Sequence, residues 1–241
     1  MAELDFDLRC YPEKSLGRVA ADHLARYNFC KEFVKGKKVL DISCGEGYGS
    51  EILNQAGAAK IWGIDNDAEI IAQAKLKYPS VNFLTAEAAK IPLPDQFFDV
   101  IVSFETWHYL EQYQDFMAEL HRLLKPQGLL ILSVPNKNNL YLKPFNHQSL
   151  TKYYKVNFNE AKIKALTKKY FVIKNWYGQR LIKKIYANGF IKLGLWVLGF
   201  ISAKWHEKIN NLYKLGNGPA VQVLNSNFSP RYFVIVCQKK N

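Results

Sequence analysis

The hydrophobic pattern of the chain alternates between short, continuously apolar runs and longer segments with apolar residues at helical spacing. The apolar runs, which we interpret as strands, are "KKVLDIS", "KIWGID", "VNFLTAE", "FFDVIVSFE", "LLILSVPN", "FVIKNWYG" and "RYFVIVCQKK". The segments with helical spacing are "SLGRVAADHLARYNFCKEFV", "GSEILNQAGA", "DAEIIAQAKLKYP", "YQDFMAELHRLLKPQG" and "NEAKIKALTKKY". Apolar strands that alternate with helices are typical of a parallel sheet covered on both faces, so the pattern predicts an α/β fold.

The order of these elements divides the chain into four parts. Residues 1–36 are predicted to form a helical cap, and residues 37–180 the core. Within the core, Asp67 lies near the start of one helix, and Pro126 with Gly128 ends another. Residues 230–241 supply the final strand. Residues 181–229 form an insertion that the regular alternation does not need.

Three glycines at alternate positions follow the first predicted strand, in the sequence "SCGEGYGS". In an open parallel sheet, ligands bind beyond the carboxyl ends of the strands, and the first strand-to-helix turn is the usual place. Gly45, Gly47 and Gly49 would let a ligand approach the backbone of this turn. Asp41, at the end of the same strand, suits a ligand with ammonium and sulfonium groups. Asp65 ends the second strand and is placed to accept both ribose hydroxyls.

Four segments between about residue 38 and residue 137 carry a family resemblance. They are "VLDISCGEGYGS", "IWGIDND", "NFLTAEAAKIPLPDQFFDVIVSFET" and "ELHRLLKPQGLLILSVPNK". Their order and spacing resemble class I S-adenosylmethionine-dependent methyltransferases of the type 11 kind. The resemblance implies a Rossmann-like, doubly wound seven-stranded sheet that is mostly parallel with an antiparallel last strand. It also implies S-adenosyl-L-methionine as cofactor. The flanking "HLARYNFCKEFVKGK" and "FVIKNWYGQ" resemble a subgroup associated with polysaccharide and O-antigen biosynthesis.

The resemblance assigns the cofactor side residue by residue. Asp41, with the backbone of residues 43–49, would hold the methionine portion, and Asp65 would bind the ribose. The Glu87 carboxylate would accept from the adenine amino group, while the backbone of Phe104 would lie beside the cofactor's amine. The residues assigned to cofactor binding are Asp41, Ser43, Gly45, Gly47, Tyr48, Gly49, Asp65, Asn66, Glu87, Ala88 and Phe104.

The segment "FETWHYL" follows the fourth strand, at the edge of the sheet where an acceptor must lie. A sulfonium is already a strong electrophile, so the protein has mainly to position the nucleophile. A general base adds roughly 10²–10⁴-fold when the nucleophile is a hydroxyl. We predict His108 as this base, with Glu105 beside it, because histidine is the natural base near neutral pH. A surface histidine, or one that only bonds the backbone, is the alternative.

The predicted reaction is O-methylation of a small or glycan-like acceptor, including a lipid- or nucleotide-linked one. N- or C-methylation of another metabolite or of RNA is the alternative, and so is a methyltransferase-like scaffold that binds partners without catalysis. The subgroup typically reads "FETIEHL" where this chain has Trp107, His108 and Tyr109 in succession. The departure concerns the acceptor side, so the acceptor stays open.

Charge is distributed unevenly along the chain, whose net charge is +12. Residues 1–135 hold 14 Lys and Arg against 19 Asp and Glu, and residues 136–241 hold 19 against 2, which together give the totals of 33 and 21. Residues 193–203 carry no charge and are flanked by lysines. We expect residues 190–203 to form a helix that covers the acceptor pocket and contacts a membrane or the second subunit of a homodimer. A nucleic-acid partner is disfavoured because it would not explain the apolar stretch.

The remaining composition points to an intracellular protein. The four cysteines are scattered without a CxxC pair, so neither a disulfide framework nor a metal site is predicted. The amino terminus lacks the apolar region of a secretory signal, and no uncharged apolar run reaches the ~18 residues of a membrane span. We therefore predict a cytoplasmic protein, with peripheral membrane contact left open by the basic carboxyl-terminal third.

Overall fold

The structure is a computed structural model of the 241-residue chain, and it describes residues 18–137, 154–183, 219–224 and 227–240. The elements of the described part are, in chain order, α1 (Arg18–Val34), β1 (Lys38–Ile42), α2 (Tyr48–Gln55), β2 (Lys60–Asp65), α3 (Ala68–Lys77), β3 (Asn82–Thr85), β4 (Phe98–Phe104), the 3₁₀ turn η1 (Trp107–Tyr109), α4 (Tyr113–Leu123), β5 (Leu124–Pro135), α6 (Glu160–Tyr170), β6 (Phe171–Lys183), β7 (Val221–Val223) and β8 (Phe228–Lys239).

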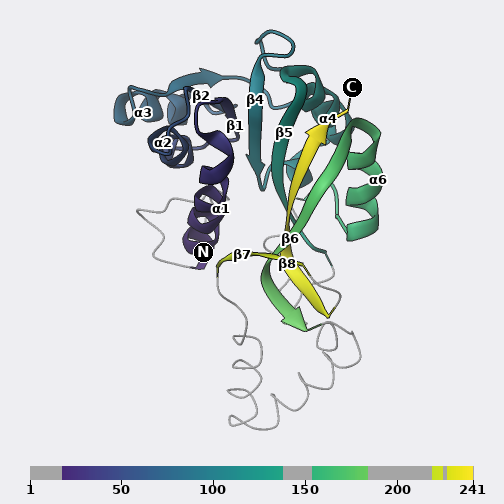
Figure 1. The fold of residues 1–241 in the computed structure, drawn as a ribbon. Helices are drawn as coiled ribbons and strands as arrows, with labels where there is room; N and C mark the ends of the chain where they lie inside the picture. Colours follow the sequence, from purple (N-terminus) through teal and green to yellow (C-terminus); the bar gives the residue numbers. More distant parts are fainter. Residues whose placement is uncertain (1–17, 138–153, 184–218, 225–226, 241) are drawn as a thin grey trace, which may run out of the picture.

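The strands of the described residues form one sheet in the order β3-β2-β1-β4-β5-β8-β6-β7 (Figure 1). The strands from β1 to β5 pair in parallel. β8 lies between β5 and β6 and is antiparallel to both. The predicted Rossmann-like sheet with an antiparallel last strand is therefore confirmed. The sheet has one strand more than the predicted seven, because the short β7 pairs antiparallel with β6 at the edge.

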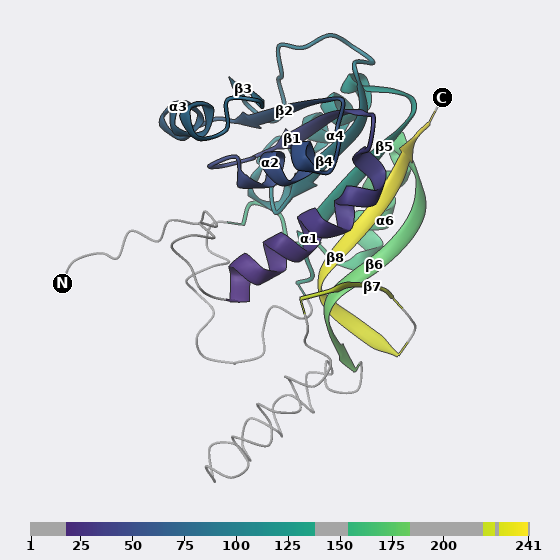
Figure 2. The same ribbon diagram turned by 60° about the vertical axis from the view of Figure 1, so that its left-hand side comes forward.

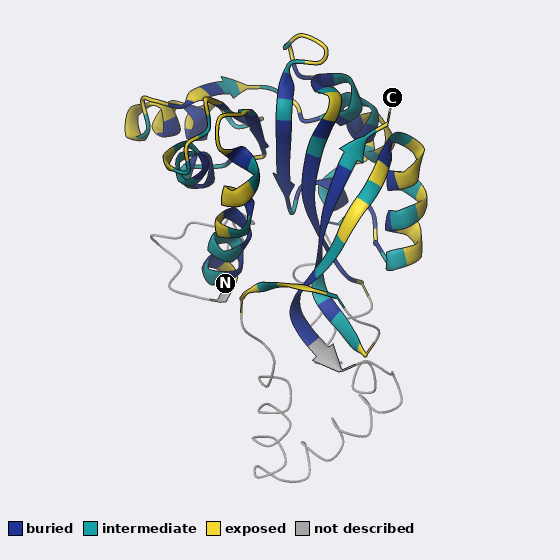
Figure 3. Ribbon diagram, viewed as in Figure 1, coloured by how far each residue is buried: buried dark blue, intermediate teal, exposed yellow. Residues whose placement is uncertain are grey.

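Helices cover the sheet on both faces, with α1, α2 and α3 on one side and α4 and α6 on the other (Figures 1 and 2). The side chains of β8 pack in both helical layers, because successive side chains of a strand point to opposite faces of the sheet. Phe233 and Ile235 pack in the α4–α6 layer, whereas Val234 and Val236 pack in the α1–α3 layer. The buried centre of the sheet explains why its strands are apolar throughout (Figure 3).

The helix ends follow local chemistry, with one difference from the sequence expectation. Asp67 caps α3 as predicted, since its carboxylate accepts from the backbone N–H groups of Glu69 and Ile70 at 2.9 and 3.1 Å. α4 ends at Leu123, before Pro126, and β5 begins at once. Proline lacks an N–H and disfavours helical backbone in the residue before it, which explains the earlier end.

The four-part division of the chain stays a prediction, although the structure bears on two of its boundaries. β6 runs to Lys183, past the expected end of the core at residue 180, and β7 lies within the expected insertion at 181–229. The predicted helix at 190–203 lies outside the described residues. Among the residues that are described, no helix is both long and apolar enough to cross a membrane.

Candidate active site

The turn after β1 has an unusual backbone conformation that opens it toward the carboxyl edge of the sheet. Ser43, Gly45 and Gly47 have φ values of 57°, 54° and 80°, in the left-handed region that glycine tolerates best. The backbone N–H of Cys44 donates to the Ile64 carbonyl of the neighbouring strand at 3.0 Å, which holds the turn against the end of β2.

The three glycines of the turn and the start of α2 serve two different purposes. A methyl group added at Gly47 would lie 2.4 Å from the Phe83 ring, and one at Gly49 would lie 2.0 Å from the Tyr27 ring. These two glycines therefore make room for the protein's own aromatic side chains. A methyl group at Gly45 would meet nothing within 4 Å. Of the three, Gly45 is the one that leaves space for a ligand beside the backbone.

Asp41 lies under the turn and is fully buried at the end of β1. Ser50 Oγ donates to its Oδ2 at 2.7 Å, and the Tyr27 hydroxyl donates to its Oδ1 at 3.1 Å. Burial raises the pKa of Asp41 to about 7, although both donors act in the opposite direction. The carboxylate thus ties α1 and α2 to β1. Its predicted contact with the methionine portion of the cofactor stays a prediction.

Asp65 ends β2 beside Gly45 and is only half-buried. Its Oδ2 accepts from the Gly45 N–H at 3.0 Å, and its Oδ1 accepts from the Asp67 N–H at 3.2 Å. Each carboxylate oxygen can accept a further hydrogen bond. The carboxylate is therefore held by the backbone, next to the open side of Gly45, in the position expected of a ribose acceptor. Asn66, which follows it, is exposed.

The predicted adenine side combines exposed and buried residues after β3. Glu87 is exposed, whereas Ala88 and Ile91 are buried. An ion pair on α4 that we did not predict from the sequence holds this loop. Arg122 donates to the carbonyl oxygens of Ile91 and Leu93 at 2.9 and 2.8 Å, and Glu119 Oε1 accepts from the Ile91 N–H at 2.6 Å. The spacing Glu-x-x-Arg predicts an ion pair on one helix face, but it does not indicate that these side chains bind the loop after β3.

Aromatic rings line the boundary between the turn and the end of β4. The Tyr27 ring packs edge-on against Tyr48, with ring centroids 5.6 Å apart, and against Phe104, at 5.0 Å. Phe104 is buried and its backbone ends β4. Tyr48 and Phe104, both predicted to contact the cofactor, are thus brought together through a residue of α1 that the sequence did not single out.

Glu105 comes directly after β4, with φ at 56°, a conformation that costs energy for a residue with a side chain. Its Oε1 accepts from Ser133 Oγ at 2.9 Å and lies 3.9 Å from Arg26 Nη1. Burial raises the pKa of Glu105, while Arg26 and the Ser133 hydroxyl act against this rise. The turn therefore places a partly shielded carboxyl group at the same sheet edge as Gly45 and Asp65.

His108 is fully buried in η1, and its two ring nitrogens have no hydrogen-bond partner among the described residues. Its ring packs against Tyr109 and Tyr154, with centroids 4.1 and 4.3 Å away. Burial, with a contribution from Arg26, lowers the pKa of His108 to about 3. The imidazole is thus neutral at physiological pH, and the predicted role as general base remains untested.

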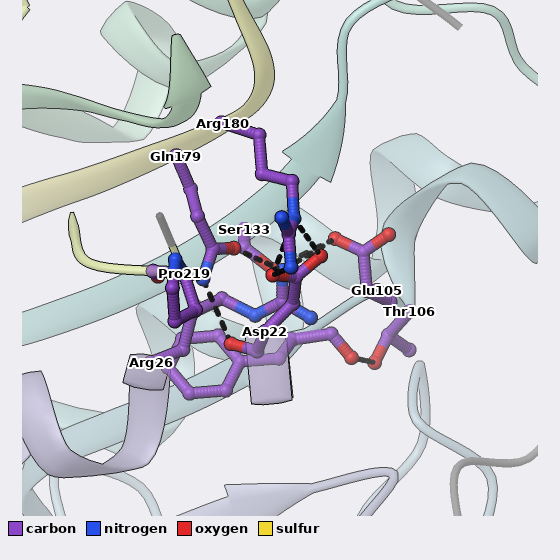
Figure 4. A network of polar contacts seen from close by, with 9 residues as sticks. Asp22, Arg26, Glu105, Thr106, Ser133, Gln179, Arg180 and Pro219 are labelled. Carbon is purple, nitrogen blue, oxygen red and sulfur yellow. Dashed lines mark hydrogen bonds and ion pairs between the residues drawn. The ribbon is translucent and has the colours of Figure 1, made fainter. Parts of the chain in front are cut away.

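A buried polar network, which no sequence pattern indicates, links α1 to the last strands (Figure 4). Arg180 binds Asp22 with Nε at 2.7 Å from Oδ1 and 2.8 Å from Oδ2. Arg26 Nη1 donates to Gln179 Oε1 at 2.8 Å, and Gln179 Nε2 donates to the Asp22 carbonyl at 2.9 Å. Arg180 has φ at 54°, which directs consecutive side chains of β6 toward α1. Pairing across more than 150 residues is not visible in a linear pattern.

The open turn at Gly45, the backbone-held Asp65 and the sheet order have the arrangement in which Rossmann-like folds bind ribose-containing cofactors. Residues 40–132 match the family model described as a methyltransferase domain. This part of the chain is therefore similar to S-adenosylmethionine-dependent methyltransferase domains.

Curated relatives show the same similarity over about half of the chain or less. A probable S-adenosylmethionine-dependent methyltransferase of Mycolicibacterium smegmatis is 31% identical over 131 residues, which are 54% of this chain and 50% of that protein. A phthiotriol/phenolphthiotriol dimycocerosates methyltransferase of Mycobacterium ulcerans is 34% identical over 115 residues, 46% of this chain and 42% of that protein. The chain thus matches half or less of the length of these curated relatives.

Solved structures show the same fold over most of the chain. A methyltransferase of Thermotoga maritima, described as a possible histamine N-methyltransferase, superposes with a TM-score of 0.63 at 17% identity and covers 91% of this chain and 90% of its own. These comparisons do not support the narrower resemblance to the polysaccharide and O-antigen subgroup.

Proposed function

We propose that the protein transfers the methyl group of S-adenosylmethionine to a hydroxyl oxygen of a small or glycan-like acceptor, including a lipid-linked one. The observation that carries this proposal is the placement of Glu105 at the same sheet edge as the open turn at Gly45 and the carboxylate of Asp65. A donor cradle and a proton acceptor at one edge are what O-methylation requires.

The cofactor residues fit the proposed ligand. Open space beside Gly45 and two further acceptor positions on Asp65 suit the ribose and the neighbouring chain of a nucleoside-derived cofactor. When bound, S-adenosylmethionine supplies a methyl group on a positively charged sulfur. Asp65 would bind the ribose, Glu87 and Ala88 the adenine, and the turn with Ser43, Tyr48 and the Phe104 backbone the methionine portion.

The acceptor hydroxyl has to lose its proton as its oxygen forms the new bond to carbon and the carbon–sulfur bond breaks. Two residues are proposed for this step, His108 and Glu105. Burial lowers the pKa of His108 to about 3, which makes it a weak base. Burial raises the pKa of Glu105, which makes it a stronger base than an exposed glutamate. This difference favours Glu105 as the group that takes the proton, with neutral His108 as a hydrogen-bonding partner of the acceptor.

The choice of a hydroxyl acceptor also rests on the relatives. Several are named for methylation of phthiotriol and phenolphthiotriol dimycocerosates, names that denote acceptors with hydroxyl groups. Their similarity covers less than half of this chain. The fold also serves a possible histamine N-methyltransferase, so an N-linked acceptor is an outcome of the test below.

The test is methyl transfer from S-adenosylmethionine with a tritiated methyl group into cell extract separated into lipid, glycan, RNA and protein fractions. Label in the lipid or glycan fraction, lost with Asp65→Ala, is the expected result. An exposed lysine variant at the start of β2, Lys60→Gln, is the matched control and retains the transfer. Label confined to RNA or protein would overturn the proposed acceptor class. Bound cofactor without label anywhere would instead point to a non-catalytic scaffold.

We further propose a peripheral contact of the basic carboxyl-terminal third with an anionic surface. Within the described part, α6 and β6 carry the exposed lysines Lys162, Lys168, Lys169 and Lys174. Each basic residue near an acidic lipid surface contributes about 1 kcal/mol, and salt screens the attraction. Flotation with anionic vesicles at low salt, absent with neutral vesicles and at high salt, is expected. A stable dimer that binds neither anionic nor neutral vesicles would instead indicate that the carboxyl-terminal third forms a subunit interface.

A further inference from the structure

Five polar side chains gather around the end of β4, and we call them the Glu105 cluster: Arg26, Glu105, His108, Tyr154 and Arg231. Arg26 lies 3.9 Å from Glu105, and the His108 ring packs against Tyr154. Arg231 belongs to β8, and its charge acts on both Glu105 and Tyr154. Four separate parts of the chain thus place charged or polar groups beside the proposed proton acceptor.

Several buried nitrogen atoms of this cluster have no hydrogen-bond partner among the described residues. They are Nε of Arg26, Nε of Arg231 and both ring nitrogens of His108. Arg26 and His108 are 1% and 0% exposed, so bulk water does not satisfy them. A buried donor without a partner costs about 1–3 kcal/mol. Two guanidinium N–H groups and one imidazole N–H are therefore available to a ligand.

The charges of the cluster do not balance. Asp22 neutralises Arg180, with Nη2 and Oδ1 2.7 Å apart, and Glu105 pairs with Arg26, with Oε1 and Nη1 3.9 Å apart. Arg231 has no ion pair with a described residue, and its Nε is buried. One positive charge is thus left over on a half-buried guanidinium group whose Nε is buried. A neutral ligand would satisfy the donors but would leave this charge.

We infer that the Glu105 cluster receives an anionic oxygen group of the methyl acceptor, a phosphate or a carboxylate, between Arg26 and Arg231. Guanidinium groups bind such planar or tetrahedral oxyanions with paired, charge-assisted hydrogen bonds. Neutral His108 adds one further donor. The inference rests on the proposed function, because it takes this sheet edge as the acceptor side. It narrows the acceptor to one that carries a negative charge close to the methylated hydroxyl.

The test is calorimetric titration of the full chain, saturated with S-adenosylhomocysteine, with inorganic phosphate, glycerol 3-phosphate, acetate and neutral glycerol. Phosphate and glycerol 3-phosphate are expected to bind, and glycerol is not. Arg231→Gln is expected to weaken phosphate binding by about tenfold to hundredfold, the effect of one charge-assisted hydrogen bond. Lys60→Gln removes an equal charge from an exposed position at the start of β2 and leaves the binding unchanged.

Folding is checked independently, because Arg26 is part of a buried network. Arg26→Lys keeps the charge but loses the paired donors, and the rise in melting temperature with S-adenosylhomocysteine reports whether each variant still folds. Equal phosphate affinity of wild type and Arg231→Gln would overturn the inference. Equal affinity for glycerol and glycerol 3-phosphate would also overturn it. A chain that binds S-adenosylhomocysteine but none of the anions would overturn it as well.

Two further arms identify the source of the anion and separate this inference from the proposed function. Competition of phosphatidylglycerol vesicles, but not phosphatidylcholine vesicles, with bound glycerol 3-phosphate identifies a lipid headgroup. Binding of glycerol 3-phosphate without such competition identifies a soluble anion, which supports the inference equally. Methyl transfer restricted to neutral acceptors would contradict the inference and leave the function intact. Anion binding without methyl transfer to any fraction would contradict the proposed function and leave the inference about the anion site intact.

Discussion

Gly45 lies in the turn after β1 and Gly49 lies four residues later in the first turn of α2, yet a methyl group added at each should have opposite consequences. At Gly45 the added group meets nothing within 4 Å, and the strain comes from φ at 54°. Left-handed backbone costs a residue with a side chain about 1–2 kcal/mol. Gly45→Ala should therefore fold, with a melting temperature about 2–8 °C lower.

At Gly49 the added group would lie 2.0 Å from Cζ of Tyr27. Such overpacking costs about 1–3 kcal/mol, and the shift of Tyr27 would also break its hydrogen bond to Asp41, at about 1 kcal/mol. Alanine returns about 1 kcal/mol through its helix propensity. The net loss of about 1–3 kcal/mol lowers the melting temperature by about 2–12 °C.

Affinity for S-adenosylhomocysteine separates the two variants. Calorimetry at 25 °C, where both variants are expected to be folded, should show at least about tenfold weaker binding for Gly45→Ala, a loss of about 1.4 kcal/mol. Gly49→Ala should lose stability and keep most of its affinity. Wild-type affinity in Gly45→Ala, or loss of affinity only in Gly49→Ala, would refute the assignment of the open space to the ligand.

Three more substitutions test other parts of the site. Asp65→Ala should weaken cofactor binding by about tenfold or more in calorimetry, because ribose hydroxyls lose a charged acceptor; unchanged affinity would contradict its role. Glu105→Gln should lower the transfer rate by roughly 10²–10⁴-fold and abolish the rise in rate with pH through the elevated pKa of Glu105; an unchanged pH profile would refute it as base. The pKa of Asp41 is about 7 in the folded state against 3.8 ordinarily, so the free energy of unfolding should fall as pH rises between these values. In denaturant titrations at several pH values, Asp41→Asn should make this fall smaller. An unchanged dependence on pH would contradict the assignment.

The features that the sequence predicts well are those set by local chemistry. The apolar strands, the cap at Asp67 and the glycine turn depend on residues close in the chain, and each appears in the structure. The position of Asp65 beside Gly45 also follows, since adjacent parallel strands end at the same edge.

The features that the sequence does not predict depend on pairing between distant segments. Nothing near Arg180 indicates that it binds Asp22 in α1, and nothing near Arg122 indicates that it holds the loop after β3. The different roles of the glycines are likewise not predictable from the sequence, because they depend on the positions of the Phe83 and Tyr27 rings. The burial of His108 changes its chemistry for the same reason, since a linear motif does not show what surrounds a side chain.

The most direct test of the central claim is to measure the S-adenosylhomocysteine formed from S-adenosylmethionine by the purified chain in the presence of cell extract. Mass spectrometry should show product that requires both the chain and the extract, and Asp65→Ala should form almost none. Binding of S-adenosylmethionine by the wild type, without product in any extract, would contradict the claim that this domain transfers a methyl group.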